Sequence, residues 1–141
     1  MIRKRFIAEG YLFLTGYRSL VKFYAHKFDI KGYIQYQPDE SMEIACEGTD
    51  KNIAFFKKAI KIRDDISYPM GFYVQSLRQR KAQSDETLGP FEIRHHRGMN
   101  AFETEMDKMW DAKMLIISWS AHKDAERAKA EKKLKLNRNR Q

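Results

Sequence analysis

The chain has 141 residues, the length of one domain, and its nine Phe, seven Tyr and two Trp are enough for a hydrophobic core. No apolar run approaches the length of a membrane-spanning helix, and the basic start is not followed by the apolar segment of a secretory signal. We therefore expect a soluble, cytoplasmic protein without membrane partners. The single cysteine, Cys46, excludes an intramolecular disulfide framework and a cysteine-based zinc site.

The net charge of +8 is unevenly distributed. Residues 1–97 hold 17 basic and 12 acidic side chains (net +5), residues 98–120 hold 2 and 4 (net −2), and residues 121–141 hold 8 and 3 (net +5). The last segment has no aromatic residue, so it cannot bury enough apolar surface to order itself, and it favours a fraying helix. We predict a basic, partly disordered tail. It is attractive to nucleic acid or another polyanion, or simply a solubilising extension.

The first half of the chain alternates between strand and helix patterns. Apolar side chains fall on alternate positions of residues 2–12, which predicts a strand. Apolar residues three and four positions apart predict a helix over residues 17–28. Residues 32–37 and 42–47 are predicted strands that form a hairpin around the turn at residues 38–41.

A second helix is predicted to begin at Thr49 or Asp50, either of which can cap it, and to bury one stripe of apolar residues. Strands over residues 71–80 and 91–94 follow, separated by a polar loop. The order is that of the split βαβ, ferredoxin-like fold, an α+β sandwich with an antiparallel sheet and two helices on one face. We assign residues 1–97 to this domain and residues 98–141 to a C-terminal helical extension.

The extension begins with an amphipathic helix whose apolar positions share one stripe: Phe102, Met106, Met109, Trp110, Lys113 and Ile117. A stripe of this kind usually packs against other protein. The sequence allows it to fold onto its own domain or to form a homodimer.

Two segments of the domain resemble the signatures of acylphosphatases. Residues 8–18, Ala-Glu-Gly-Tyr-Leu-Phe-Leu-Thr-Gly-Tyr-Arg, resemble G-x-V-Q-G-V-x-F-R at the passage from the first strand to the first helix. Residues 32–39, Gly-Tyr-Ile-Gln-Tyr-Gln-Pro-Asp, resemble G-x-V-x-N-x-x-D-G. The resemblance extends over about residues 5–97.

The resemblance implies hydrolysis of the carboxyl–phosphate bond of a small acyl phosphate, without metal or other cofactor. Backbone N–H groups of the loop before the first helix would hold the phosphate, or another anion, at the positive end of that helix. The planar fork of Arg18 would bind the phosphate oxygens. The implied phosphate-binding residues are Phe13, Leu14, Thr15, Gly16, Tyr17 and Arg18.

The chain departs from the signatures at two places. Phe13-Leu14 replaces Gln-Gly, which adds a Cβ where the backbone approaches the anion. Tyr36 replaces the Asn that positions the attacking water, and a phenol cannot both accept from and donate to that water in the same geometry. Arg18 and Tyr36 are thus the implied catalytic positions. We expect phosphate binding to persist and hydrolysis to be weakened or lost, with Tyr36 serving as a core or groove-wall aromatic.

Two functions stay open at this point: a weakened acylphosphatase, or a non-catalytic binding module that associates with nucleic acid through its basic tail. A metal site is not favoured, because the adjacent His95 and His96 point to opposite faces of a strand. Cys46 alternates with Ile44 and Met42 and is expected to be a buried hydrophobe rather than a nucleophile.

Overall fold

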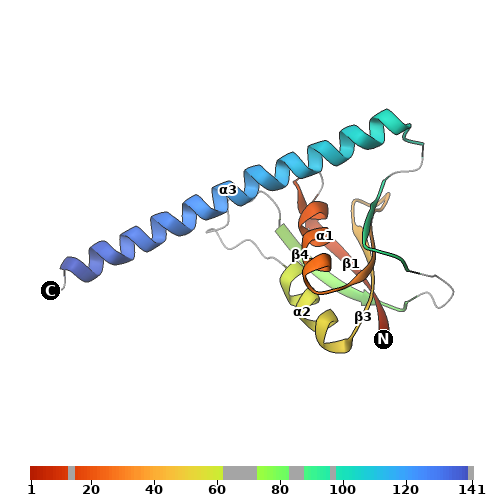
Figure 1. The fold of residues 1–141 in the computed structure, drawn as a ribbon, viewed down its shortest axis with the longest axis horizontal. Coiled ribbons are helices and arrows are strands. Elements are labelled where there is room, and N and C mark those ends of the chain that lie inside the picture. Colours follow the sequence, from red (N-terminus) through yellow and green to blue (C-terminus); the bar gives the residue numbers. More distant parts are fainter. Residues whose placement is uncertain (13–14, 62–72, 83–87, 96–97, 140–141) are drawn as a thin grey trace.

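The structure, a computed structural model, describes residues 1–12, 15–61, 73–82, 88–95 and 98–139. The elements follow in the predicted order (Figure 1). They are β1 (Ile2–Tyr11), α1 (Tyr17–Lys27), β2 (Lys31–Tyr36), β3 (Met42–Gly48), α2 (Asp50–Ile60), β4 (Tyr73–Arg80), β5 (Glu92–Arg94) and α3 (Ala101–Asn139). Their bounds differ from the predicted ones by one or two residues, and the predicted start of β4 at residues 71–72 lies outside the described residues.

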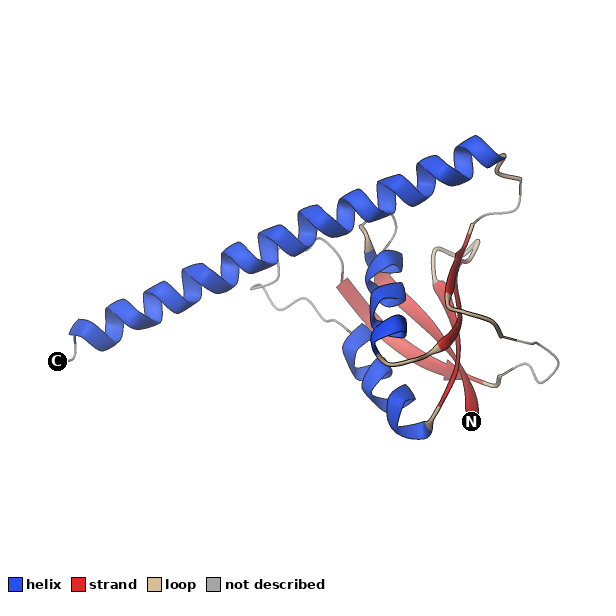
Figure 2. Cartoon of the chain, viewed as in Figure 1, coloured by secondary structure: helices blue, strands red, loops and turns tan. Residues whose placement is uncertain are grey.

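The strands form one sheet in the order β4-β1-β3-β2-β5. The pairs among β4, β1, β3 and β2 are antiparallel, whereas the short β5 runs parallel to β2 at the edge. This mixed sheet, with its helices, is the predicted α+β, ferredoxin-like fold (Figure 2). The prediction of the fold class is therefore confirmed, with a parallel edge strand added to the expected antiparallel sheet.

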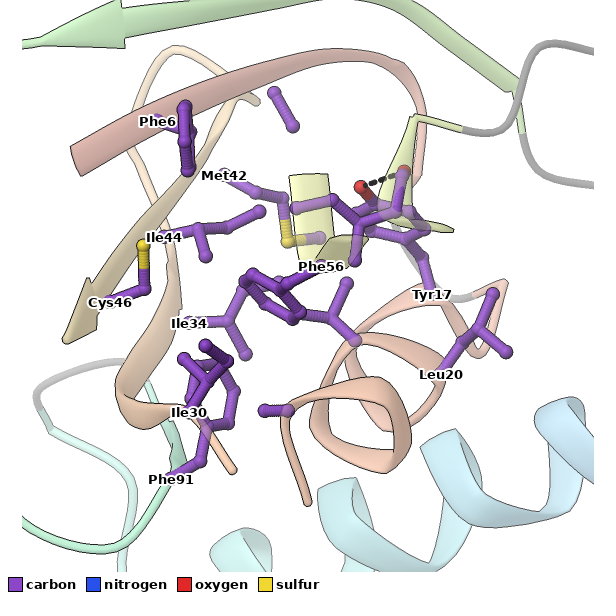
Figure 3. Close-up of a cluster of buried hydrophobic side chains, with 14 of the residues drawn as sticks. Phe6, Tyr17, Leu20, Ile30, Ile34, Met42, Ile44, Cys46, Phe56 and Phe91 are labelled. Atoms are coloured by element: carbon purple, nitrogen blue, oxygen red, sulfur yellow. Dashed lines mark hydrogen bonds between the residues drawn. The ribbon is translucent and has the colours of Figure 1, made fainter. Parts of the chain in front are cut away.

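The hydrophobic core lies between the sheet and the two short helices (Figure 3). Alternate positions of the central strands supply it: Phe6 and Ala8 from β1, and Met42, Ile44 and Cys46 from β3, are all buried. Burial also raises the pKa of the Cys46 thiol to about 12. The interpretation of Cys46 as a buried hydrophobe is confirmed.

The two helices are fixed to each other as well as to the sheet. Thr49, one of the two caps that the sequence allowed, caps α2 by accepting a hydrogen bond from the backbone N–H of Asn52 at 3.1 Å. At the other end of α2, the carbonyl of Ile60 accepts a hydrogen bond of 2.7 Å from the buried hydroxyl of Tyr17. Because Tyr17 is the first residue of α1, this bond fixes the place where α1 begins (Figure 3).

Helix α3 is a single helix of 39 residues that lies against α1 and continues well past the domain (Figure 1). Its apolar stripe does not fold onto the domain: Phe102, Met106, Met109, Trp110 and Ile117 are all exposed. Among the described side chains of α3, Asp107 and Asp111 contact α1 instead, so the first of the two arrangements that the sequence allowed for the stripe is wrong. A homodimer through the stripe stays a prediction. No helix among the described residues is long and apolar enough to cross a membrane.

Candidate functional site

The start of α1 offers backbone donors that its own cap does not use. Gly16, the N-cap residue, adopts a left-handed conformation (φ 89°) and provides no side-chain cap. The first N–H groups of a helix have no partner within the helix and, with the helix dipole, attract anions. The local sequence therefore creates an anion-attracting end, which the core holds in place through Tyr17.

Arg18, the second residue of α1, directs its guanidinium group at two carboxylates of α3. Its Nη2 and Nη1 contact Oδ1 and Oδ2 of Asp107, each at 3.0 Å, and its Nε lies 3.5 Å from Oδ1 of Asp111. The Asp107 contact has the two-pronged geometry with which arginine binds carboxylates and phosphates. All three side-chain nitrogens of Arg18 thus face a carboxylate oxygen, and only 5% of the residue is exposed.

Asp111 reaches the backbone end of the same site. Its Oδ2 accepts a hydrogen bond of 2.7 Å from the backbone N–H of Ser19 and a second, short one from the Ser19 hydroxyl. Asp111 is only 2% exposed, so an ionised carboxylate here depends on Arg18, Ser19 and the helix end for compensation. One carboxylate of α3 therefore caps α1 from outside.

Asp107 is shared between Arg18 and His95, which follows β5 directly. The Nδ1 atom of His95 contacts Oδ2 of Asp107, and among the described residues the buried Nε2 atom of His95 has no partner. Burial by itself raises the pKa of Asp107, but the contacts with Arg18 and then His95 outweigh burial and hold this pKa below its ordinary value.

The same balance acts on the other side of the contact. Burial by itself lowers the pKa of Arg18, but Asp107 and Asp111 outweigh burial and raise it above its ordinary value. Arg18 and Asp107 therefore both favour their charged forms.

Tyr36 lies at the end of β2, half-buried, with its side chain packed against the hydrophobic core. Its pKa is raised, first by desolvation and then by the negative charges of Glu40 and Asp39 in the following turn. The packing agrees with the interpretation of Tyr36 as a core or groove-wall aromatic.

The remaining predicted site residues are only partly described. Phe13 and Leu14 lie outside the described residues. Thr15 is buried, and its hydroxyl donates a hydrogen bond of 2.6 Å to the carbonyl of Leu12. Gly16, Tyr17 and Arg18 lie at the turn into α1, and their role in phosphate binding stays a prediction.

Sequence reasoning missed Ser19, His95, Asp107 and Asp111 as neighbours of Arg18. A signal was available, because the two aspartates are four residues apart and so lie on one face of a helix, opposite the apolar stripe. They also belong to the only one of the three charge segments with an acidic excess.

The geometry defines a class of protein: a ferredoxin-like domain whose first helix begins with a buried arginine. Residues 4–93 match the family model Acylphosphatase. The acylphosphatase of Actinobacillus pleuropneumoniae serotype 5b (strain L20) is 31% identical over 94 residues, which are 67% of this chain and 99% of that protein. The chain belongs to the acylphosphatase family.

Solved structures agree with this assignment. The crystal structure of the acylphosphatase from Bacillus subtilis has 25% identity and a TM-score of 0.56, and the match covers 67% of this chain and 99% of that one. An acylphosphatase from Coxiella burnetii, at 13% identity and a TM-score of 0.54 over 65% of this chain and 90% of that one, shares the fold.

Proposed function

We propose that the start of α1 binds the phosphate group of a small acyl phosphate, with Arg18 and the backbone N–H groups of Thr15 to Ser19 as donors. The observation that carries this proposal is the pair of carboxylates at the site. A carboxylate stands in for part of a phosphate group, because both present oxygens in the geometry that a guanidinium fork accepts. Asp107 and Asp111 therefore indicate that this end of α1 is built for anions.

Family membership supports hydrolysis of the bound acyl phosphate. Hydrolysis should be slow, because Tyr36 stands where the family signature has Asn. Losing a group that positions the attacking water typically lowers a rate by on the order of 10² to 10⁴. Binding by Arg18 does not depend on that group. The domain is then a phosphate-binding member of the family with residual hydrolytic activity.

The test is hydrolysis of benzoyl phosphate by the full chain and three variants. Tyr36→Asn should raise the rate at least about tenfold, because the amide can orient a water and occupies less space than the phenol. Tyr36→Phe, the matched control, leaves an aromatic ring and should not raise it. Arg18→Ala should reduce the activity of Tyr36→Asn to background.

Two results would contradict the proposal. A rate indistinguishable from background in Tyr36→Asn would contradict the proposed hydrolytic activity. Equal rates with and without Arg18 would contradict the proposed phosphate site at the start of α1. The cytoplasmic location expected from the sequence stays a prediction.

A further inference from the structure

The two carboxylates that indicate an anion site also occupy it. We infer that α3 is an internal competitor of the substrate: Asp107 and Asp111 hold the donors that a phosphate group would use, and an anion binds only when this part of α3 moves away. The inference rests on the proposed function, because it assigns the regulation of the same site.

Helix α3 occupies the part of the site that Arg18 provides. Each of its three side-chain nitrogens faces an oxygen of Asp107 or Asp111. The N–H of Ser19, which would face an anion at the end of α1, is bound to Asp111. A phosphate placed there would find the two-pronged face of the Arg18 guanidinium taken by Asp107 and would meet two negative charges at close range. Phosphate and α3 therefore compete for the same donors.

The competitor is an addition to the domain and not part of it. The family match ends at residue 93, and the Actinobacillus relative is covered almost completely by 94 residues. Helix α3 begins at Ala101, beyond this shared length. The charge cluster therefore joins the domain that this chain shares with the relative to a helix that the relative is too short to contain.

Among the residues of α3 whose side chains the structure describes, the one that is buried is charged, which suits the docking of α3 to release. Its apolar residues Phe102, Met109 and Trp110 remain exposed. Of the α3 residues whose side chains are described, Asp111 is the buried one. Carboxylates held by an arginine and a helix end can be exchanged for another anion that uses the same donors. A core-like apolar interface would not permit such exchange.

The test measures the affinity for inorganic phosphate by following the amide NMR signals of Thr15 to Ser19. The double variant Asp107→Asn and Asp111→Asn should bind phosphate roughly tenfold to hundredfold more tightly than the wild-type chain, a range typical of coupled sites. The matched control, Glu103→Gln and Glu105→Gln, removes the same charge from exposed positions of the same helix and should bind as the wild type does. Arg18→Ala added to the double variant should abolish binding.

The outcomes separate this inference from the proposed function. Equal phosphate affinity in the wild type and the double variant, with loss of binding on Arg18→Ala, would overturn the competition and leave the site intact. Absence of phosphate binding in the double variant, or binding that ignores Arg18→Ala, would overturn both.

A second measurement uses the wild-type chain and does not depend on the folding of the variants. If phosphate and α3 compete, phosphate must weaken the docking of α3 by the same factor by which docking weakens phosphate binding. Hydrogen exchange at residues 104–114 should then accelerate in phosphate relative to chloride of equal ionic strength, because an undocked helix loses tertiary support. Exchange that does not change up to about 100 mM phosphate would mean that α3 is a permanent brace, and the inference would be wrong.

Discussion

Gly32 shows how a single backbone position maintains the strand that carries Tyr36. It lies in β2 at φ 142°, and an added Cβ would be 1.8 Å from the carbonyl oxygen of Ala45 on β3. This is a backbone atom in the middle of the sheet, so it cannot move aside without disturbing the pairing of β2 with β3. The family signature begins with glycine at this position, and the close approach of the strands supplies the physical reason.

Gly32→Ala is expected to lower the free energy of unfolding by at least about 2 kcal/mol, because it combines a steric overlap with an unfavourable φ. Urea denaturation measures the change. Gly89→Ala is the matched control, since Gly89 is exposed and an added Cβ has nothing within 4 Å. Equal stability of the two variants would contradict the close approach of β2 and β3.

At the scale of elements, the contact between α1 and α3 has a defined pH dependence. Burial alone raises the pKa of Asp107, but Arg18 and His95 outweigh it and hold the pKa below the ordinary value. A carboxyl group with a lowered pKa in the folded state stabilises that state above its unfolded pKa, about 3.9. The stabilisation is lost as the pH falls through the folded pKa.

Comparison of the wild type with Asp107→Asn isolates this contribution. As the pH falls from 5 to about 2, the difference in the free energy of unfolding between the two proteins should narrow. Protonation of Asp107 removes from the wild type the same negative charge that the substitution removes from the variant. Urea denaturation at a series of pH values gives both curves. A difference that stays constant over this interval would show that the contact with Arg18 does not lower the pKa of Asp107.

The elements themselves were predictable because their signals are local. Tyr17, Leu20 and Val21 share one face of α1, and the alternation of Met42, Ile44 and Cys46 identifies the buried face of β3. A helix stripe or strand alternation depends only on residues a few positions apart. The order of these elements was then enough for the fold class.

The docking face of α3 was not predictable by the same reasoning. The spacing of Asp107 and Asp111 shows that they share a face of the helix, but it does not identify Arg18 and Ser19, 89 and 92 positions away, as their partners. The apolar stripe was the stronger local signal and indicated the opposite face. The charged face of α3 docks in place of the apolar stripe. Arg18 is buried at the start of α1, and leaving its charge without a partner costs more free energy than leaving the apolar side chains exposed.

For the whole molecule, the net positive charge and the candidate site are separated along α3. The helix has 39 residues and so is about 58 Å long, and its last part continues beyond the domain (Figure 2). Residues 121–127 are neutral, because Lys123 and Arg127 balance Asp124 and Glu126. Residues 128–141 hold six basic side chains against Glu131, a net +5 of the total +8. The polyanion hypothesis therefore concerns these last 14 residues.

Removing residues 128–141 should weaken binding to single-stranded DNA and flatten its salt dependence, by up to about 0.7 units of log–log slope for each cation that contacts a phosphate. The free energy of unfolding should change by less than about 0.5 kcal/mol, because the side chains of residues 128–139 are all exposed. A full-length chain with the six basic residues replaced by Gln separates charge from length and should behave like the truncated chain. If both variants bind DNA with the wild-type affinity and salt slope, the tail is a solubilising extension. The positive charge of the tail then contributes to solubility and not to binding a polyanion.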